Sequence, residues 1–379
     1  MVDTTRQESR TGGGAVPPGG PRRRWVLGAG LAGAAVAGGV ATWLVTGRDD
    51  EPPAAAPQRD WTPRTHVSAA DLDTKWAGVY RTHDVAENTE FGEWLGRPLD
   101  VAVVFGAQND WYALTHPWFA YEAPEGQDWA AWVRERPDER KLVVSTAMVP
   151  EGVPEDWRAR GAAGEYDDHW VEYGRNLRDW GIGSSIIRLG WEMNGDWYET
   201  HYIGETAEQR EQWKEYFRRI VRAVEVEGTS FEIDFTIAEG PQDSVAIDEM
   251  YPGDDYVDII GMDVYDSWIA PIDPGARWQA KGEKINSVPK LVEFAAEHDK
   301  PLSFAEWAMV AEGRTQGGGD SPEFIHQMAD VIAANPVRYQ AYFDVPAGGV
   351  GMTLADAPLG AAAFLQRFGP GGDAAPTDR

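Results

Sequence analysis

The sequence predicts an α/β fold, a (β/α)8 TIM barrel, preceded by an N-terminal signal or anchor segment. Between Trp76 and Phe368, eight short apolar runs alternate with segments of helical period, which is the pattern of βα units around a parallel sheet. Eight strands with intervening helices over roughly 300 residues is the count of such a barrel. A doubly wound open sheet is the alternative, but no Gly-x-Gly-x-x-Gly or Walker-type phosphate loop follows any of the runs.

Each expected strand is a short apolar run that is too brief for a helix. We place the eight strands at Ala77–Arg81, Asp100–Phe105, Lys141–Thr146, Ser185–Glu192, Glu232–Ala238, Val257–Tyr265, Leu302–Glu306 and Tyr339–Asp344. Apolar residues at a 3.6-residue period predict helices between several of them, over Trp213–Val224, Val288–Ala295 and Phe324–Ile332.

Composition limits the class of protein. Hydrophobic residues make up 42% and charged residues 25% of the 379 positions, which is typical of a globular protein with a sizeable core. The formal net charge of -28 argues against binding nucleic acid or anionic membrane surfaces. The chain has no cysteine, so it holds no disulfide and offers no site for N-terminal lipidation.

The N-terminal segment predicts export. Three arginines, Arg22 to Arg24, stand directly before an uncharged stretch from Val26 to Val45, which matches a twin-arginine signal. The stretch is about long enough to span a bilayer, so an uncleaved anchor over 26–46 that tethers the protein to the membrane is the rival to a cleaved signal. Either case predicts an extracellular or cell-surface location.

These segments divide the chain into four parts. We expect a cytoplasmic n-region with its signal or anchor helix at 1–46, a linker rich in Pro, Ala and charge at 47–73, the barrel at 74–369 and a disordered tail at 370–379.

The stretch SSIIRLGWEMNGDWY, from Ser184 to Tyr198, places an ionisable pair on one core strand. Because strand side chains alternate, Arg188, Gly190 and Glu192 should share one face, with Trp191 on the other. Burying these charges is costly unless they are paired or used. A structural ion pair is one explanation. Sugar binding is the other, since an amide and aromatic rings follow at once.

A second carboxylate ends the seventh strand. The run PLSFAEWAM should place Leu302, Phe304 and Glu306 on one face. The carboxyl ends of all barrel strands meet at one mouth, so Glu192 and Glu306 should face each other there.

The sixth strand adds a third set at the same mouth. In VDIIGMDVYD, alternation predicts a shared face for Gly261, Asp263 and Tyr265.

Two facing glutamates suit glycoside hydrolysis. That reaction needs one carboxyl group to protonate the leaving oxygen and another, ionised, to attack the anomeric carbon. Two unrelated acids on the barrel rim are the alternative.

With these residues placed, the chain resembles a glycoside hydrolase of family 26, in the clan of retaining (β/α)8 enzymes of β-mannanase and β-glucanase type. The resemblance covers about residues 74 to 369, and WEMNGDWY at 191–198 is its most specific motif. VDIIGMDVYD, KPLSFAEW, AYFDVP and the helix expected at Pro358–Phe368 support it.

The resemblance implies roles for individual residues. Glu192 matches the acid/base and Glu306 the nucleophile, Tyr265 falls where the clan often has a tyrosine that hydrogen-bonds the nucleophile, and Arg188 matches an arginine of the site floor. Trp191 departs from the pattern, because family mannanases usually have histidine immediately before the acid/base. Tryptophan cannot accept a hydrogen bond, so the motif does not specify β-mannan as the substrate.

The remaining candidates are contacts to sugar, for which amides and aromatic faces are suited. With Arg188 and Trp191, we assign substrate binding to Asn194, Trp197, Asp263 and Trp307. No histidine spacing or acidic run has the pattern of a metal site, so we expect neither metal nor cofactor in the chemistry.

The sequence therefore predicts an exported, monomeric, retaining glycoside hydrolase that acts inside chains of a β-linked polysaccharide or oligosaccharide. A non-catalytic carbohydrate-binding protein on a hydrolase barrel is one alternative. A cell-envelope transglycosylase, which shares the mechanism and differs in the acceptor, is another.

Overall fold

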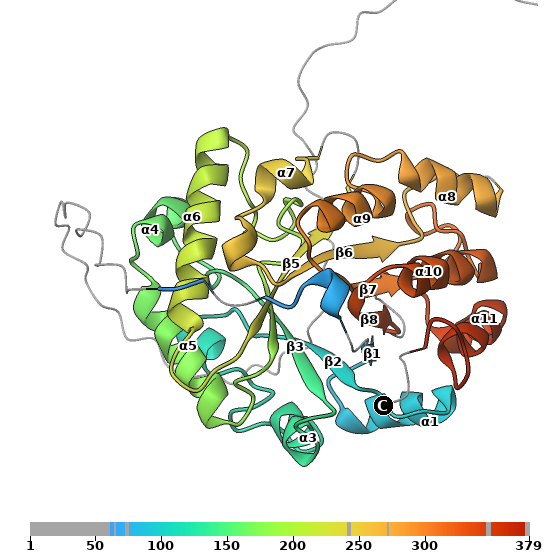
Figure 1. Cartoon of the computed structure of the whole chain (residues 1–379), viewed down its shortest axis with the longest axis horizontal. Coiled ribbons are helices and arrows are strands. Elements are labelled where there is room, and N and C mark those ends of the chain that lie inside the picture. Colours follow the sequence, from blue (N-terminus) through green and yellow to red (C-terminus); the bar gives the residue numbers. More distant parts are fainter. Residues whose placement is uncertain are drawn as a thin grey trace, which may run out of the picture.

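The structure, a computed structural model, describes residues 61–63, 66–72, 76–240, 244–270, 273–345 and 350–375. In this part of the chain eight strands pair in sequence order and close into a barrel. Every pair is parallel, including the closing pair of the first and last strands. The helices surround the ring of strands (Figure 1). The predicted (β/α)8 barrel is confirmed.

The strands lie where the sequence predicts them, with shifts at their ends. Their bounds are β1 Trp76–Tyr80, β2 Val101–Phe105, β3 Lys141–Thr146, β4 Ile186–Leu189, β5 Glu232–Ala238, β6 Ile259–Tyr265, β7 Leu302–Ala308 and β8 Val337–Phe343. The largest difference is at β4, which ends three residues before Glu192.

The helices connect the strands on the outside of the barrel. They are α1 Val85–Leu95, α2 Trp111–Thr115, α3 Trp129–Glu135, α4 Trp157–Ala162, α5 Asp167–Asp179, α6 Ala207–Val224, α7 Ile247–Met250, α8 Pro274–Gly282, α9 Val288–Glu297, α10 Pro322–Ala334 and α11 Pro358–Phe368. Short 3-10 turns occur at η1 Ala69–Asp71, η2 Asp254–Tyr256 and η3 Leu354–Asp356.

The longest helix, α6, shows which sequence features start a helix and determine its buried face. Thr206 and Gln209 form a capping box at the start of α6, in which each side chain accepts a hydrogen bond from the other's main-chain N–H. The apolar side chains of its 3.6-residue period are buried against the barrel. Helices α9 and α10 each follow a serine and have a proline in the first turn, and the side chain of Ser321 accepts from the Phe324 N–H at the start of α10.

Apolar side chains form two cores. The larger lies between the strands and the helices, and includes alternate residues of β6 such as Ile260, Met262 and Val264. The smaller lies inside the barrel and comprises Trp76, Val101, Val103, Val143, Ile186, Ile259, Ala305, Tyr339 and Ala341. Polar side chains also lie inside the barrel, where Asp234 accepts hydrogen bonds from Ser303 and Tyr339.

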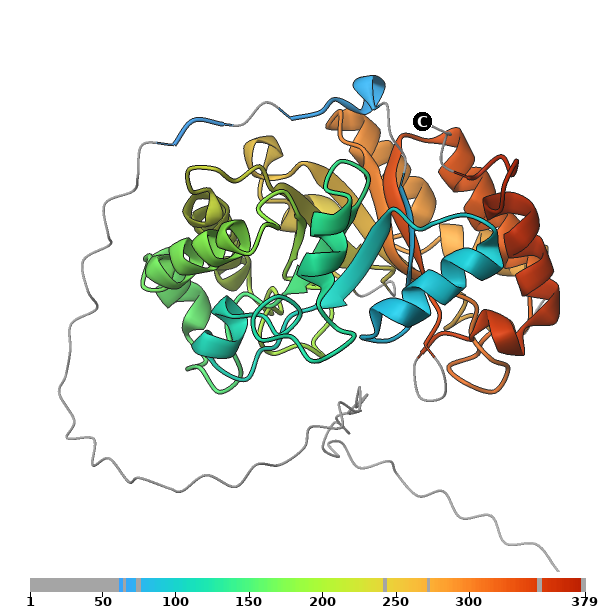
Figure 2. The ribbon, with the colours of Figure 1, turned by 90° about the horizontal axis from the view of Figure 1, so that it is seen from below.

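Residues 61–63 and 66–72, which the sequence assigns to the linker, pack on the barrel body (Figure 2). The ring of Trp61 stacks on Tyr256 at 4.9 Å and its Nε1 donates to Glu225. His66 contacts Asp258, which lies just before β6. The contacted residues precede strands, so this segment covers the end of the barrel opposite the mouth.

The signal or anchor expected at 1–46 lies outside the described residues. None of the helices in the described ranges combines the length and apolar character needed to cross a membrane. At the other terminus, Arg367 pairs with Asp373 at 2.6 Å and Ala374 is buried. The packed body therefore extends to about 375, beyond the boundary expected at 369.

Candidate active site

Arg188 is the centre of the barrel mouth. Arg188 is the third residue of β4, and its side chain is fully buried. Nη1 donates to Ser145 Oγ on β3 at 3.0 Å and to Glu306 Oε1 on β7 at 2.6 Å, and Nη2 donates to Asp263 on β6. One guanidinium thus joins four strands, and its charge is matched by two carboxyl groups.

Glu306 faces into the barrel because β7 is irregular. The pairing register shifts on both sides of this strand, against β6 between Gly261 and Val264 and against β8 between Phe304 and Trp307. Such shifts place two consecutive residues on one side of a strand.

The shift corrects the face predicted for this strand. Ser303 and Ala305 point inward, whereas Leu302 and Phe304 belong to the outer core. Glu306 follows Ala305 inward rather than sharing a face with Phe304. Strict alternation fails here because the bulge places two consecutive residues on the same side of β7. The sequence of the strand contains no glycine that would indicate a bulge.

Glu192 follows β4 in a turn, not on the strand. Gly190 and Glu192 both have positive φ, 57° and 53°, so the predicted alternation of Arg188, Gly190 and Glu192 on one strand face is wrong. A left-handed conformation costs a non-glycine residue of order 1 kcal/mol or more and is often found at functional sites. The turn is held by the Glu192 N–H, which donates to the Thr236 carbonyl at 2.9 Å.

The carboxyl group of Glu192 lies in a site that favours its protonated form. Burial, followed by the charge of Glu306, raises its pKa to about 7. The indole Nε1 of Trp197 donates to Glu192 Oε2 at 2.9 Å, which partly offsets the rise. At neutral pH Glu192 can therefore both give and accept a proton.

Tyr265 supplies the second hydrogen bond to Glu306. Its hydroxyl donates to Oε2 at 2.8 Å, so both oxygens of that carboxylate have a donor. Burial and the charge of Glu306 raise the pKa of Tyr265 well above its ordinary value, and the phenol stays a donor. Gly261, Asp263 and Tyr265 share the inner face of β6, as predicted.

Asp263 belongs to the floor of the site. Its side chain is fully buried and paired with Arg188, which differs from the sugar contact that the sequence predicts. Burial raises the pKa of Asp263 despite the attraction of Arg188, and its carboxyl group also contributes to the pKa of Glu192.

Asn194 and Trp307 make structural contacts within the protein. Both ends of the Asn194 amide bond the main chain of Ala238 at 2.9 Å, which fastens the Glu192 loop to the end of β5. Trp307 is buried on the helix side of β7, where its Nε1 donates to Gln340 and its ring stacks on Phe364. The expected sugar contact of Trp307 is corrected by this placement.

Trp191 is buried beside the floor, and Trp197 is open. The Trp191 side chain is 4% exposed and packs against Phe105 and His201 at 5.5 and 4.4 Å, with the Arg188 guanidinium 5.8 Å from its ring. Trp197 is 48% exposed. Of the two, Trp197 offers a ring face to a ligand.

Ser145 and His201 complete the site but were missed in the sequence. Ser145 could have been found as a polar residue near the end of an apolar strand. His201 lies beneath Trp191, and its burial lowers its pKa to about 3, so it is neutral. It lies only three residues after the motif at 191–198, but nothing in the residues around it indicates that its ring packs against Trp191. Within the described ranges, no three His, Asp or Glu side chains are grouped so as to hold a metal ion.

This chain is similar to known proteins in part of its sequence and in its fold. Residues 165–302 match the model of glycosyl hydrolase family 26, a segment that contains Arg188, Glu192 and Tyr265 and ends at the first residue of β7. A search of curated proteins finds no match.

Several solved structures share the fold at low sequence identity. A family 26 β-mannanase of Bacteroides ovatus matches at 15% identity and a TM-score of 0.52, over 78% of this chain and 88% of that one. A double mutant of the endo-β-1,4-mannanase of Cellulomonas fimi matches at 16% and 0.53, over 78% and 71%. The catalytic domain of a family 26 endo-β-1,4-mannanase of Bacillus sp. JAMB-750 matches at 15% and 0.51, over 80% and 87%.

These structures show the likeness of fold, and the family model covers the sequence around the acid that follows β4. Together they confirm the resemblance to glycoside hydrolase family 26 that is expected from the sequence.

Proposed function

We propose that the protein is a retaining glycoside hydrolase that cleaves a β-linked polysaccharide or oligosaccharide by double displacement, at bonds inside the glycan rather than at its ends. The observation that carries the proposal is the contrast between the two glutamates. Glu306 is held by Arg188 and Tyr265, one donor on each oxygen, as suits an ionised nucleophile. Glu192 has a pKa of about 7, as suits an acid/base.

The proposed reaction has two steps. In the first, the Glu306 carboxylate attacks the anomeric carbon while the Glu192 carboxyl group gives its proton to the departing oxygen. In the second, Glu192 takes a proton from water, the water oxygen attacks the anomeric carbon, and the ester to Glu306 breaks. Both glutamates return to their starting protonation states.

The substrate is proposed as a class, a β-linked glycan. Trp197 is half exposed and hydrogen-bonded to Glu192, so it offers a sugar ring a stacking face next to the acid/base. The solved relatives are described as mannanases, which favours β-mannan. Trp191 disfavours it, because an indole has no acceptor for a sugar hydroxyl. Asn194 and Asp263 contribute to the proposed binding site by holding its loop and floor.

The test is a substrate screen with the purified full-length protein. β-Mannan, mixed-linkage β-glucan, xylan and cell-envelope glycans are incubated with the protein and the products are sized. Shorter products from one polymer support the proposal and name the sugar, and a mixture of internal sizes shows endo action. Binding to a polymer that stays intact would instead support a carbohydrate-binding protein.

The alternatives are weighed by the same screen. Both glutamates are present with their hydrogen-bond partners, which disfavours a barrel that has lost catalysis. A cell-envelope transglycosylase would lengthen or exchange chains when an acceptor glycan is added, whereas a hydrolase would only shorten them.

Export is a separate proposal, which rests on Arg22 to Arg24 and the uncharged stretch that follows. We propose the twin-arginine route to the cell surface or the medium, as a monomer. Replacing Arg22, Arg23 and Arg24 by lysine should retain the protein in the cytoplasm. Normal export of that variant would exclude the route.

A further inference from the structure

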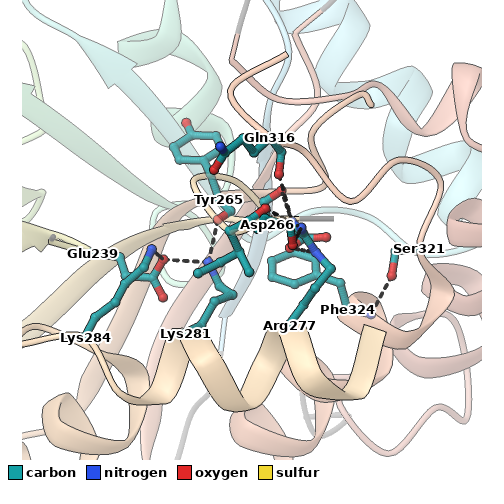
Figure 3. Close-up of polar contacts among 11 residues, drawn as sticks. Glu239, Tyr265, Asp266, Arg277, Lys281, Lys284, Gln316, Ser321 and Phe324 are labelled. Atoms are coloured by element: carbon teal, nitrogen blue, oxygen red, sulfur yellow. Dashed lines mark hydrogen bonds and ion pairs between the residues drawn. The ribbon is translucent and has the colours of Figure 1, made fainter. Parts of the chain in front are cut away.

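Helix α8 and the turn that follows it carry three buried cations next to the site (Figure 3). Arg277 and Lys281 are four residues apart, which puts them on one face of α8. Lys284 lies in the turn just after the helix ends at Gly282. All three are buried, with Lys281 only 2% exposed. Buried charges are costly unless each has a matched partner, so their partners show what the helix holds.

Lys281 bonds two strand ends at once. Its Nζ donates to Glu239 Oε2, directly after β5, at 2.5 Å and to the main-chain carbonyl of Tyr265, the last residue of β6, at 2.6 Å (Figure 3). Lys284 donates to the same Glu239 oxygen at 2.8 Å. In the described part of the chain Lys284 makes no hydrogen bond to Tyr265.

Arg277 fixes the neighbouring loop. Its guanidinium donates to the Asp266 carboxylate at 2.8 Å and to the Gln316 carbonyl at 3.1 Å, and Figure 3 shows it reaching both from α8. The helix is thereby fastened to the ends of β5 and β6 and to the loop after β7.

Tyr265 is consequently held at both ends. Its carbonyl accepts from Lys281, and its hydroxyl donates to Glu306 Oε2 at 2.8 Å. Burial lowers the pKa of Lys281, and the Glu239 carboxylate opposes that fall. The ammonium is therefore stabilised by the same carboxylate that orients it.

We propose that Lys281 is a positioning residue for the nucleophile: it fixes the main chain at Tyr265 so that the phenol stays on Glu306. The proposal rests on the roles proposed above for Glu306 and Tyr265. It predicts that the ammonium affects the rate of the chemical step rather than substrate binding, since displacement of a reacting group by about 1 Å can cost roughly a hundredfold in rate.

The variant is Lys281→Met, which keeps the length of the side chain and removes the charge and donors. Its matched control is Lys284→Met, which removes a buried ammonium from the same carboxylate without touching Tyr265. With the glycan identified by the screen, we expect Lys281→Met to lower kcat by about ten- to a hundredfold with KM within about twofold. Lys284→Met should stay within about threefold of the parent in kcat. Equal losses in the two variants would overturn the proposal.

A double-mutant cycle separates positioning from general structure. If Lys281 acts through Tyr265, then Lys281→Met should add less than about twofold to the loss caused by Tyr265→Phe. Multiplied losses would mean that Lys281 acts elsewhere and would overturn the proposal. Each variant is first compared with the parent by near-UV circular dichroism and thermal unfolding.

If Lys281→Met does not fold, Lys281→Arg replaces it in the cycle, because it keeps the ion pair with Glu239 and moves the donor at the Tyr265 carbonyl. The proposed function fails separately: an inactive parent, or a fully active Glu306→Ala, would refute the assignment of the nucleophile. An active parent with normal kcat in the folded Lys281 variants refutes only the inference about Lys281.

Discussion

Nη1 of Arg188 lies 2.6 Å from Oε1 of Glu306, so a residue of β4 holds a carboxylate that is 118 positions later in the chain. The contact is buried on both sides, with the Arg188 side chain fully inaccessible. Arg188 also pairs with Asp263. The floor of the barrel mouth is thus one cation between two acids, and its loss should affect stability and activity together.

Arg188→Met should destabilise the fold by roughly 3–5 kcal/mol, because it leaves two buried carboxyl groups without their counter-charge. Urea unfolding followed by fluorescence measures the free energy of unfolding. Arg136→Met is the control, since its pair with Glu139 is about half exposed and such surface pairs contribute less than about 1 kcal/mol. Equal effects of the two substitutions would contradict the account of the floor.

Glu306→Ala should abolish hydrolysis, by at least roughly a thousandfold in kcat, while leaving glycan binding measurable. The reason is that the first chemical step has no nucleophile, whereas Trp197 and the rest of the barrel mouth are unchanged. Activity is measured by release of reducing ends and binding by affinity electrophoresis. Glu293→Ala, at an exposed position on α9, is the control. Activity of Glu306→Ala within about tenfold of the parent would place the nucleophile elsewhere.

The pH dependence should report the protonation of Glu192. Its folded-state pKa is raised to about 7, so the acid form needed for the first step is present below that pH and is lost as pH rises through it. The value of kcat/KM should therefore fall on the alkaline side of about pH 7. Trp197→Phe removes the N–H that favours the carboxylate, and should move this alkaline limb to higher pH. A limb that stays in place would assign it to another group.

Glu192→Ala should show a loss of activity that depends on the leaving group. Aryl glycosides of acidic phenols need little protonation and should still form the glycosyl-enzyme, whereas the polysaccharide should not be cleaved. Added azide should speed turnover, because it attacks the intermediate without a general base. Phenol release with and without azide is followed by absorbance. Equal losses for good and poor leaving groups would remove Glu192 from this role.

The sequence predicts the barrel well because periodic apolar runs determine which elements form and in what order. All eight strands were found, and β3 and β5 match residue for residue. What failed was the direction of side chains near strand ends. The bulge that turns Glu306 inward and the left-handed backbone of Glu192 break a strict alternation, and both depend on pairing with neighbouring strands rather than on local sequence.

Residues that join the site through long-range contacts also could not be predicted from the sequence. Lys281 lies on a helix between two site motifs, and nothing in its neighbours indicates that it bonds the carbonyl of Tyr265. Trp307 follows Glu306 directly, yet the bulge places it among the helices. Distance in sequence from a motif was therefore a poor guide to distance from the site, both for Lys281, which is remote in sequence, and for Trp307, which is adjacent.

The stereochemistry of the reaction tests the geometry of the two glutamates. The charge of Glu306 contributes to the raised pKa of Glu192, which requires the two carboxyl groups to be near each other. We predict a separation of ~5 Å, too small for a water to stand between a carboxylate and the anomeric carbon, whereas ~6.5 to 9.5 Å would allow a single displacement by water. Two successive inversions at the anomeric carbon then give net retention. Proton NMR of the first-formed anomer, read before mutarotation, distinguishes these cases. An inverted first product would refute both the covalent intermediate on Glu306 and the close approach of Glu192 on which the proposed function depends.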